Sequence, residues 1–371
     1  TRSVEYSELK TEYDLYDSEI TTTMVMEDMP TPRDTYLLIR GVYDKPDTSN
    51  KLAADMPSMF GKMDDSLPKN RLGLAEWLVN PDHPLTARVR VNHYWQQYFG
   101  QGIVKTSEDF GTQGSSPSHP DLLDYLAVDF VESGWDVKRM QKKIVMSATY
   151  RQSAKMNQEQ LAKDPENILL GRSPRYRYSA ETIRDQALHV SGLLNAEVGG
   201  PSVRPYQPER MWSAITFEAF NKYDTNLYTP DTGDDLYRRG LYTYWKRTIA
   251  PPRMQIFDAS DRERCSLRED ITNTPLQAMV LLNDPTFVEA ARHLAVRMMH
   301  EGGDSAAERI RYGYKLALAY EPDEVRQTIL ANGLQKYIRH YGDRYAEAVA
   351  FISVGFSGYD VTMDEQELAA Y

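Results

Sequence analysis

Residues 70–100 read NRLGLAEWLVNPDHPLTARVRVNHYWQQYFG, and they predict two successive helices. Asn70 can cap a first helix over residues 71–79, because an Asn side chain accepts hydrogen bonds from the first free backbone N–H groups. Thr86 can cap a second helix that runs to Gly100, a residue able to adopt the left-handed conformation that ends helices. Apolar side chains recur at helical spacing along both segments, so the stretch indicates a helical body.

The same helix signals extend in both directions from this stretch. Pro120 suits the first position of a helix over residues 121–132, and Ser179 can cap a helix over residues 180–195. Further helices are predicted over residues 137–147, from Pro208 through Trp212, and over residues 275–282, 285–300, 305–320 and 323–341. The fold class is therefore mainly α, a multi-helix globular body.

Two short segments have the composition of strands. Residues 35–41 and 240–247 are rich in aromatic and β-branched side chains, and they could pair in a small sheet. Residues 1–33 are acidic and read as irregular, and residues 44–70 read as a surface loop because prolines and weak periodicity dominate them. A minor β element is therefore expected beside the helices.

The length of 371 residues favours more than one lobe. We expect four regions: an irregular segment with a short strand over 1–67, a helical lobe over 68–155, a mixed connector with a long helix and a short strand over 156–272, and a C-terminal helical lobe over 273–371. The first residue is not Met, and the last helix reaches Tyr371 without Gly or Pro. Both ends therefore look like limits of a longer protein.

Charge and cysteine content narrow the function classes. The 54 acidic residues outnumber 43 Lys and Arg residues, and the net charge of −11 argues against a general nucleic-acid binder and against simple attachment to anionic lipid. No apolar run approaches the roughly 20 residues that span a bilayer. Cys265 is the single cysteine, so this chain has no intrachain disulfide, cysteine zinc site or C-x-x-C-H haem attachment. We expect its side chain to be semi-buried.

A polar stripe on the second helix is the first candidate site. Arg88, Asn92 and Gln96 share one helix face at i, i+4 and i+8, and Trp95 lies beside them. These side chains could line a pocket. They could instead form a buried hydrogen-bond network that ties the helix to a neighbouring loop, which is the favoured alternative because buried polar groups need partners.

Other candidate residues have similar pairs of interpretations. His119 precedes Pro120 at a helix start, where its ring could fix the loop or face a cleft. Arg268, Asn273 and Gln277 could bind an anionic or hydroxyl-rich ligand, although capping and structural pairing around Thr274 are the favoured interpretation. The acidic loop at 231–235 lacks the calcium-binding spacing, and the seven histidines contain no helical zinc signature.

Several of these segments resemble one family. The resemblance is carried by residues 70–78 and 84–95, Glu108-Asp109-Phe110-Gly111, residues 118–124, Gly134-Trp135, residues 147–153, residues 180–185 and residues 272–278. Together they resemble the planctomycete-type domain of unknown function 1553 (PSD1), over about residues 24–371. The resemblance implies a bacterial, exported, multidomain protein of extracytoplasmic location, periplasmic or at the cell surface. It also implies association with c-type cytochrome-like domains in organisms that degrade complex polysaccharides, but no known activity.

Three hypotheses follow for function. In the first, the chain is a module of an extracytoplasmic redox or glycan-processing protein, and Arg88, Asn92, His119, Arg184 and Asp185 converge on one pocket. In the second, it is a structural or docking domain for a cytochrome-bearing partner or a cell-surface assembly. A metal-dependent hydrolase is the least favoured. Any c-type haem would belong to a missing segment or a partner subunit, and whether the chain is an enzyme stays open.

Overall fold

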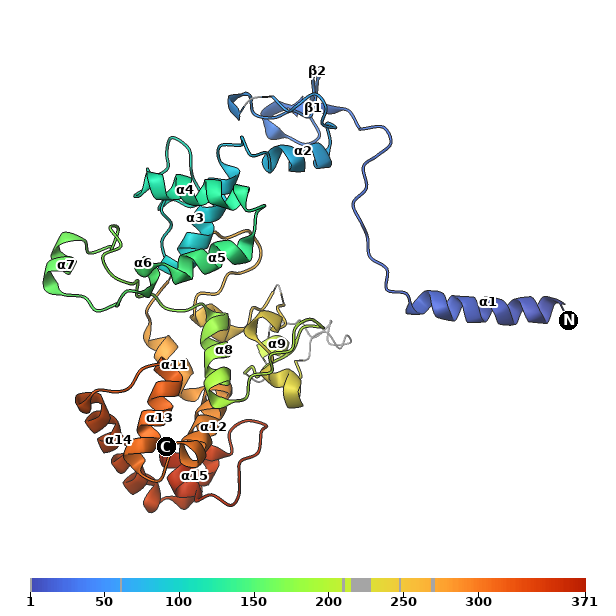
Figure 1. Ribbon diagram of the computed structural model, residues 1–371. Coiled ribbons are helices and arrows are strands. Elements are labelled where there is room, and N and C mark those ends of the chain that lie inside the picture. Colours follow the sequence, from blue (N-terminus) through green and yellow to red (C-terminus); the bar gives the residue numbers. More distant parts are fainter. Residues whose placement is uncertain (1, 61, 209–210, 215–227, 247, 268–270) are drawn as a thin grey trace. The chain divides into compact units, whose positions relative to one another are not determined.

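The computed structural model describes the whole chain except residues 1, 61, 209–210, 215–227, 247 and 268–270 (Figure 1). The chain divides into two compact units, residues 1–152 and 153–371. Helices make up most of the regular structure in both units, and the described strands pair in one two-stranded sheet. The predicted class, mainly α with a minor β element, is therefore confirmed.

The sheet is an antiparallel hairpin in the first unit. β1 (Thr35–Leu38) pairs with β2 (Pro46–Leu52), and Ile39–Gly41 between them forms a single 3-10 turn. The strand predicted over residues 35–41 is thus present but shorter. The prediction of a loop over residues 44–70 was wrong for residues 46–52, which form β2. Pro46 does not prevent this strand, because it occupies the first strand position, where a missing N–H is tolerated.

A helix also replaces part of the predicted irregular N-terminal segment. α1 (Arg2–Glu19) covers a stretch without Gly or Pro, so nothing in its sequence interrupts helical hydrogen bonding. Its side chains are exposed along the described length. The prediction of irregular structure over residues 1–33 was wrong here because the acidic, Tyr-rich composition has no strong apolar stripe.

The two helices of residues 70–100 form as predicted. Asn70 caps α2 (Arg71–Leu78), since its Oδ1 accepts hydrogen bonds from the backbone N–H groups of Leu72 at 3.0 Å and Gly73 at 3.2 Å. α3 (Thr86–Phe99) ends at Gly100, whose φ of 74° is left-handed. Local capping chemistry therefore sets the start of α2 and the end of α3, as predicted.

The start of α3 differs from the prediction. Thr86 is the first helical residue of α3, and Leu85 occupies the capping position without a side-chain hydrogen bond. The side chain of His83 caps the helix instead, because its Nδ1 accepts hydrogen bonds from the backbone N–H groups of Leu85 at 3.3 Å and Thr86 at 3.2 Å. The histidine ring therefore satisfies the orphan donors at the N-terminus of α3.

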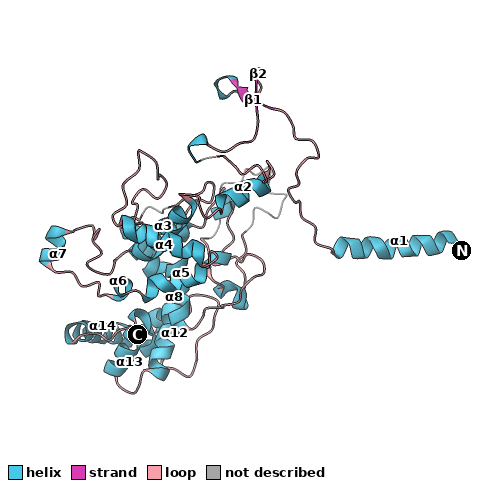
Figure 2. Cartoon of the chain, turned by 45° about the horizontal axis from the view of Figure 1, so that its top comes forward, coloured by secondary structure: helices cyan, strands magenta, loops and turns pink. Residues whose placement is uncertain are grey.

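A helical core fills the rest of the first unit. α3 packs against α4 (Pro120–Glu132) and α5 (Val137–Met146), which lie beside it in Figure 2, and α6 (Ala148–Arg151) follows directly. Pro120 opens α4 as predicted. The buried apolar side chains of this core are Val91, Tyr94, Trp95, Phe99, Leu123, Leu126, Phe130, Met140 and Ile144. Each contributes about 1.5–3 kcal/mol by leaving water.

The second unit is built around two long helices. α8 (Ala180–Ser191) packs against α12 (Pro285–Glu301). The other helices described in this unit are α7 (Gln158–Lys163), α9 (Met211–Ala214), α10 (Pro252–Ile256), α11 (Pro275–Asn283), α13 (Ala306–Leu318), α14 (Glu324–Gly342), α15 (Tyr345–Ile352) and α16 (Glu365–Ala370). Of these, α10, α11, α13 and α16 contact α8 or α12. α8 ends before the predicted residue 195, because Gly192 adopts a φ of 83°.

The strand predicted over residues 240–247 is wrong. Gly240–Tyr242 forms a 3-10 turn, and Thr243 makes only an isolated bridge with Val203. The reason is tertiary: the backbone N–H of Gly240 donates to Asp185 Oδ1 at 2.5 Å, and an added Cβ at this glycine would lie 2.9 Å from the Cα of Glu181. Close packing against α8 therefore overrides the strand-like composition.

Candidate functional site

The polar stripe of α3 is a buried hydrogen-bond network at its centre. Asn92 is fully buried, and its Nδ2 donates to Val104 O and to Ser107 Oγ, both at 3.1 Å. Its Oδ1 accepts from the Val104 backbone N–H at 2.8 Å, while Ser107 Oγ also donates to Gln96 Oε1. The network therefore ties α3 to the loop that follows it, as the favoured alternative predicted.

The other predicted residues of the first unit lie outside this network. Arg88 is at the surface, where its Nε donates to Asp124 Oδ1 at 2.7 Å. Trp95 is buried and stacks on Phe99 with ring centroids 4.1 Å apart. His119 precedes α4 without capping it, and its Nδ1 lies 3.0 Å from Ser118 Oγ. Each of these three side chains thus has its own partners, and none of them lines the cleft described below.

Arg184 and Asp185 connect α8 to residues 236–240. The Arg184 side chain is 1% exposed and donates to the carbonyl oxygens of Arg238 at 2.5 Å and Leu236 at 2.8 Å. Burial lowers the pKa of Arg184 to about 10, so the guanidinium remains charged at neutral pH. Both residues therefore hold the folded backbone in place, and their use by a ligand stays a prediction.

The motif around Thr274 has the capping role that was one of its two interpretations. Thr274 is the residue before α11, and its backbone N–H donates to Gln277 Oε1 at 3.4 Å. Gln277 is buried and its Nε2 donates to Ile256 O at 2.9 Å, whereas Asn273 is exposed. Arg268 lies outside the described residues. Capping thus accounts for Gln277, and ligand binding by this motif stays a prediction.

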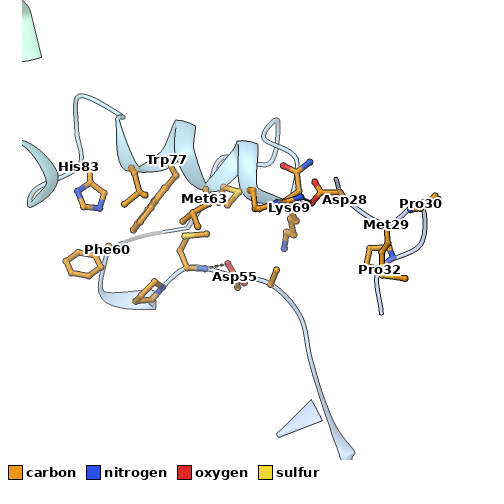
Figure 3. A pocket seen from close by; sticks show the side chains of 17 residues that line it. Asp28, Met29, Pro30, Pro32, Asp55, Phe60, Met63, Lys69, Trp77 and His83 are labelled. Atoms are coloured by element: carbon orange, nitrogen blue, oxygen red, sulfur yellow. Dashed lines mark hydrogen bonds and ion pairs between the residues drawn. The ribbon is translucent and has the colours of Figure 1, made fainter. Parts of the chain in front are cut away.

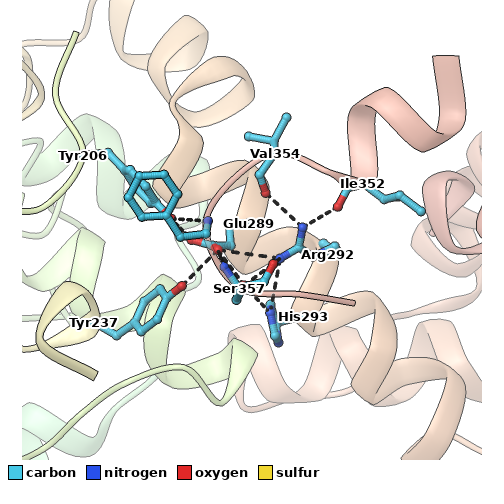
Figure 4. A network of polar contacts seen from close by, with 9 residues as sticks. Tyr206, Tyr237, Glu289, Arg292, His293, Ile352, Val354 and Ser357 are labelled. Carbon is cyan, nitrogen blue, oxygen red and sulfur yellow. Dashed lines mark hydrogen bonds and ion pairs between the residues drawn. The ribbon is translucent and has the colours of Figure 1, made fainter. Parts of the chain in front are cut away.

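A buried network around Glu289 was not anticipated from the sequence. Glu289 is 1% exposed, and its carboxylate accepts from the Tyr206 hydroxyl at 2.9 Å, the Tyr237 hydroxyl at 3.0 Å and the Ser357 backbone N–H at 2.7 Å (Figure 4). Arg292 lies one turn along α12, with Nη2 at 3.6 Å from Glu289 Oε1. In the sequence, the i, i+3 spacing of Glu289 and Arg292 was the one feature that could have indicated this pair.

The chemistry of the Glu289 network indicates a structural centre. Arg292 donates to Ile352 O and, at 2.9 Å, to Val354 O, so the network anchors the loop after α15 onto α12. Burial raises the pKa of Tyr206 and lowers the pKa of His293, and both groups are therefore neutral at pH 7. Neither Glu289 nor Arg292 lines a described cavity. We assign the network to fold stability.

The first unit contains an open apolar cleft, whose lining side chains are drawn in Figure 3. It has a volume of about 940 Å³ and is bounded by α2, residues 28–32 and residues 54–63. Its apolar lining comes from Met29, Pro30, Pro32, Ala54, Met56, Pro57, Phe60, Met63, Leu74, Trp77 and Leu78. Several remain accessible, with Met29 64% and Leu74 40% exposed. None of the residues proposed from the sequence lines it.

The two ends of the cleft differ in character. At one end, Phe60, Trp77 and His83 form an aromatic cluster, with the His83 ring stacked on Phe60 at 5.8 Å and edge-on to Trp77 at 4.5 Å (Figure 3). At the other end, Arg71 pairs with Asp28 at 2.6 Å, and Lys69 lines the rim. In the described part of the chain no carboxylate lies within ion-pair distance of Lys69. Asp55 also lines the cleft, so the two cations and the two carboxylates of the lining balance, and Lys69 is the cation left without an ion pair among the described residues.

Most of the chain is similar to a known protein family. Residues 70–334 match the family described as PSD1, protein of unknown function (DUF1553). The chain belongs to this DUF1553 family. No curated protein and no solved structure matches it. The matched residues include α2 with its cleft-facing side chains, the α3 network and Glu289. Residues 28–32 and 54–63, which form the rest of the cleft, precede the matched residues.

The described residues contain neither a group of side chains suited to a metal ion nor a helix suited to spanning a membrane. Among them, no group of three or more His, Cys, Asp and Glu side chains could hold a metal ion. Asp231 of the acidic loop accepts a hydrogen bond from the Arg204 backbone N–H at 2.6 Å.

Cys265 is exposed, so the expectation of a semi-buried thiol was wrong. Residues 261–267 around it are all exposed. No described helix is long and apolar enough to cross a bilayer.

Proposed function

We propose that this DUF1553 chain is a docking module whose apolar cleft binds an amphipathic helix of a partner protein. The observation that carries the proposal is the cleft itself: a broad, accessible apolar surface between α2 and residues 54–63. A contiguous apolar surface in water marks a binding site more often than a solvated face. A groove of this kind suits the apolar face of a helix.

The charge of Lys69 at the rim of the cleft favours a partner helix with an acidic side chain. Lys69 stands at the rim, and the nearby Arg71 is already paired with Asp28. A partner helix that carries a Glu or Asp next to its apolar face would pair with Lys69 when it binds, which adds specificity more than affinity. The resemblance of the chain to cytochrome-associated, exported proteins suggests a cytochrome-bearing partner in an extracytoplasmic assembly.

A glycan is the less favoured occupant of the cleft. Sugar recognition needs accessible aromatic faces together with polar side chains that bond hydroxyl groups. Trp77 is half-buried and its ring already contacts Phe60 and His83, while most of the lining is aliphatic. A redox or glycan-processing role for the complete protein would then reside in the partner, with this chain positioning it.

A photo-crosslinking experiment followed by a direct binding measurement tests the proposal. A photoreactive amino acid replaces Leu78 in the cleft or, as a control, Leu72, which is 58% exposed on the same helix but does not line the cleft. The chain is irradiated in an extract of its source organism. The captured protein is identified, stained for haem, purified and titrated against the unlabelled chain.

The expected result is one protein captured from position 78 and not from position 72. Leu74→Glu should weaken its binding at least tenfold, because a charge enters the apolar wall, whereas Leu72→Glu should change it less than twofold. Lys69→Glu should weaken binding, and a Glu→Lys change in the partner helix should restore it. Equal effects of Leu74→Glu and Leu72→Glu, or binding of a soluble sulfated polysaccharide with quenching of Trp77, would contradict the proposal.

A further inference from the structure

The second unit contains a separate pocket between α10 and α11. Its volume is about 460 Å³, within the range of small-molecule sites. Residues 206–208, Pro252–Ile256 of α10 and residues 276–285 contribute its walls. None of its lining residues belongs to the docking cleft, so the pocket can be considered independently of the proposed function.

The pocket combines an apolar wall with one buried cation. The apolar side chains are Ile256, Leu276, Met279 and Val280, together with Pro208, Pro252 and Pro285. Leu276 and Met279 are each 58% exposed, so the wall is accessible from solvent. Arg253 is the cation, and it is only 6% exposed. Such a cation costs free energy unless its N–H groups find acceptors.

Arg253 is only partly satisfied. Its Nη1 donates to Asp284 Oδ1 at 3.0 Å and to Thr286 Oγ1. Across the residues that the structure describes, Nε and Nη2 make no hydrogen bond, although both belong to a side chain lining the pocket. A guanidinium with a free edge of this kind can bind a carboxylate through two parallel hydrogen bonds.

A second polar group lines the same pocket without a partner. The side-chain oxygen Oε1 of Gln207 is buried and accepts no hydrogen bond. Since the two ends of an amide are assigned by their partners, a rotation about the last bond would present Nε2, a donor, in its place. Arg253 and Gln207 thus both line the pocket and both keep polar atoms without a partner among the described residues.

The local charges permit an anion. Asp284 is the nearest carboxylate, and its Oδ1 already accepts from Arg253 and from the Thr286 backbone N–H at 2.9 Å. Arg184 interacts electrostatically with Arg253, and its charge is offset by Asp185 at 3.9 Å, so the surroundings of the pocket are close to neutral and add no net negative charge. We propose that the pocket binds small carboxylates with an apolar chain, the carboxylate on Arg253 and the chain along Leu276 and Met279.

Calorimetric titration of the full chain with octanoate, octanamide and octylammonium tests the proposal. Octanoate should bind at least tenfold more tightly than octanamide, since a charge-assisted hydrogen bond exceeds a neutral one. Octylammonium should not bind measurably. Met279→Trp, which fills the pocket, should abolish octanoate binding, and Leu282→Trp on the same helix should not, because Leu282 is 71% exposed and lies outside the lining.

Further variants separate the charge from the volume. Arg253→Gln should remove the preference for octanoate over octanamide. If that variant does not fold, the Met279→Trp and Leu282→Trp pair still decides the question, because both positions are exposed. Leu74→Glu in the docking cleft should leave octanoate binding unchanged. Equal affinity for octanoate and octanamide, no binding at all, or binding unaffected by Met279→Trp would overturn the proposal.

Discussion

Replacing Asn92 with alanine should destabilise the first unit by about 2–4 kcal/mol. The substitution leaves the backbone N–H and C=O of buried Val104 without the amide that bonds both. Each buried group without a partner costs about 1–3 kcal/mol. The total should fall toward the lower part of this sum, because Ser107 Oγ is 3.5 Å from Val104 O and can move toward it.

Arg88→Ala provides the matched control for this prediction. Arg88 lies one turn before Asn92 on the same helix, but its ion pair with Asp124 is exposed. Exposed ion pairs contribute about 0–1 kcal/mol, so this variant should unfold close to the wild type. The two substitutions therefore separate a buried network from a surface contact on one helix face.

Hydrogen exchange followed by mass spectrometry is the appropriate assay, because it resolves the two units. Peptides covering residues 100–107 should lose protection in the Asn92→Ala variant, and peptides from residues 180–191 should not change. Urea unfolding provides the size of the effect. A loss below about 0.5 kcal/mol for Asn92→Ala, or an equal loss for Arg88→Ala, would refute the conclusion that the Asn92 network stabilises the first unit.

Three further outcomes are expected. Gly355→Ala should lower the stability of the second unit by more than about 2 kcal/mol in urea unfolding, since φ is +95° and an added Cβ would lie 2.4 Å from the Glu289 carboxylate; Gly358→Ala, with nothing within 4 Å, should have a small effect. Burial, and secondarily Arg292, lower the pKa of His293, so unfolded chains bind the proton more readily. Stability should therefore be full above the ordinary histidine pKa and fall as pH decreases through the lowered one, less steeply in His293→Gln. Cys265 is exposed and should react with a thiol reagent in the native chain at nearly the rate measured in urea; protection would contradict its exposure.

Local signals predicted helix boundaries well. Asn70, Pro120 and Ser179 each begin a helix where expected, and Gly100 ends one. These residues act on backbone groups within four positions of themselves, so their effect can be read without knowing the rest of the fold. Thr86 failed as a cap because a neighbouring histidine, which has no strong capping preference, took that role.

Function-related residues were harder to predict than helices. The polar stripe of α3 was visible in the sequence, and so was the alternative that it forms a network. The cleft was not visible, because its wall combines α2 with residues 28–32 and 54–63, and the latter two segments carry no periodic pattern. The Arg253 pocket likewise joins residues 206–208 to α10 and α11.

Sequence alone determined the helical class, most ends of the helices that it predicted, the family and the polar residues that need buried partners, but it missed helices such as α1, α7, α10 and α15. Only the tertiary structure decided which strands pair, which side chains remain exposed and which segments form a cavity. The physical reason is distance along the chain: capping and periodicity act over one or two turns, whereas the contacts of Glu289 with Tyr206 and Ser357 join positions 83 and 68 residues apart. Such contacts depend on the packing of the whole unit.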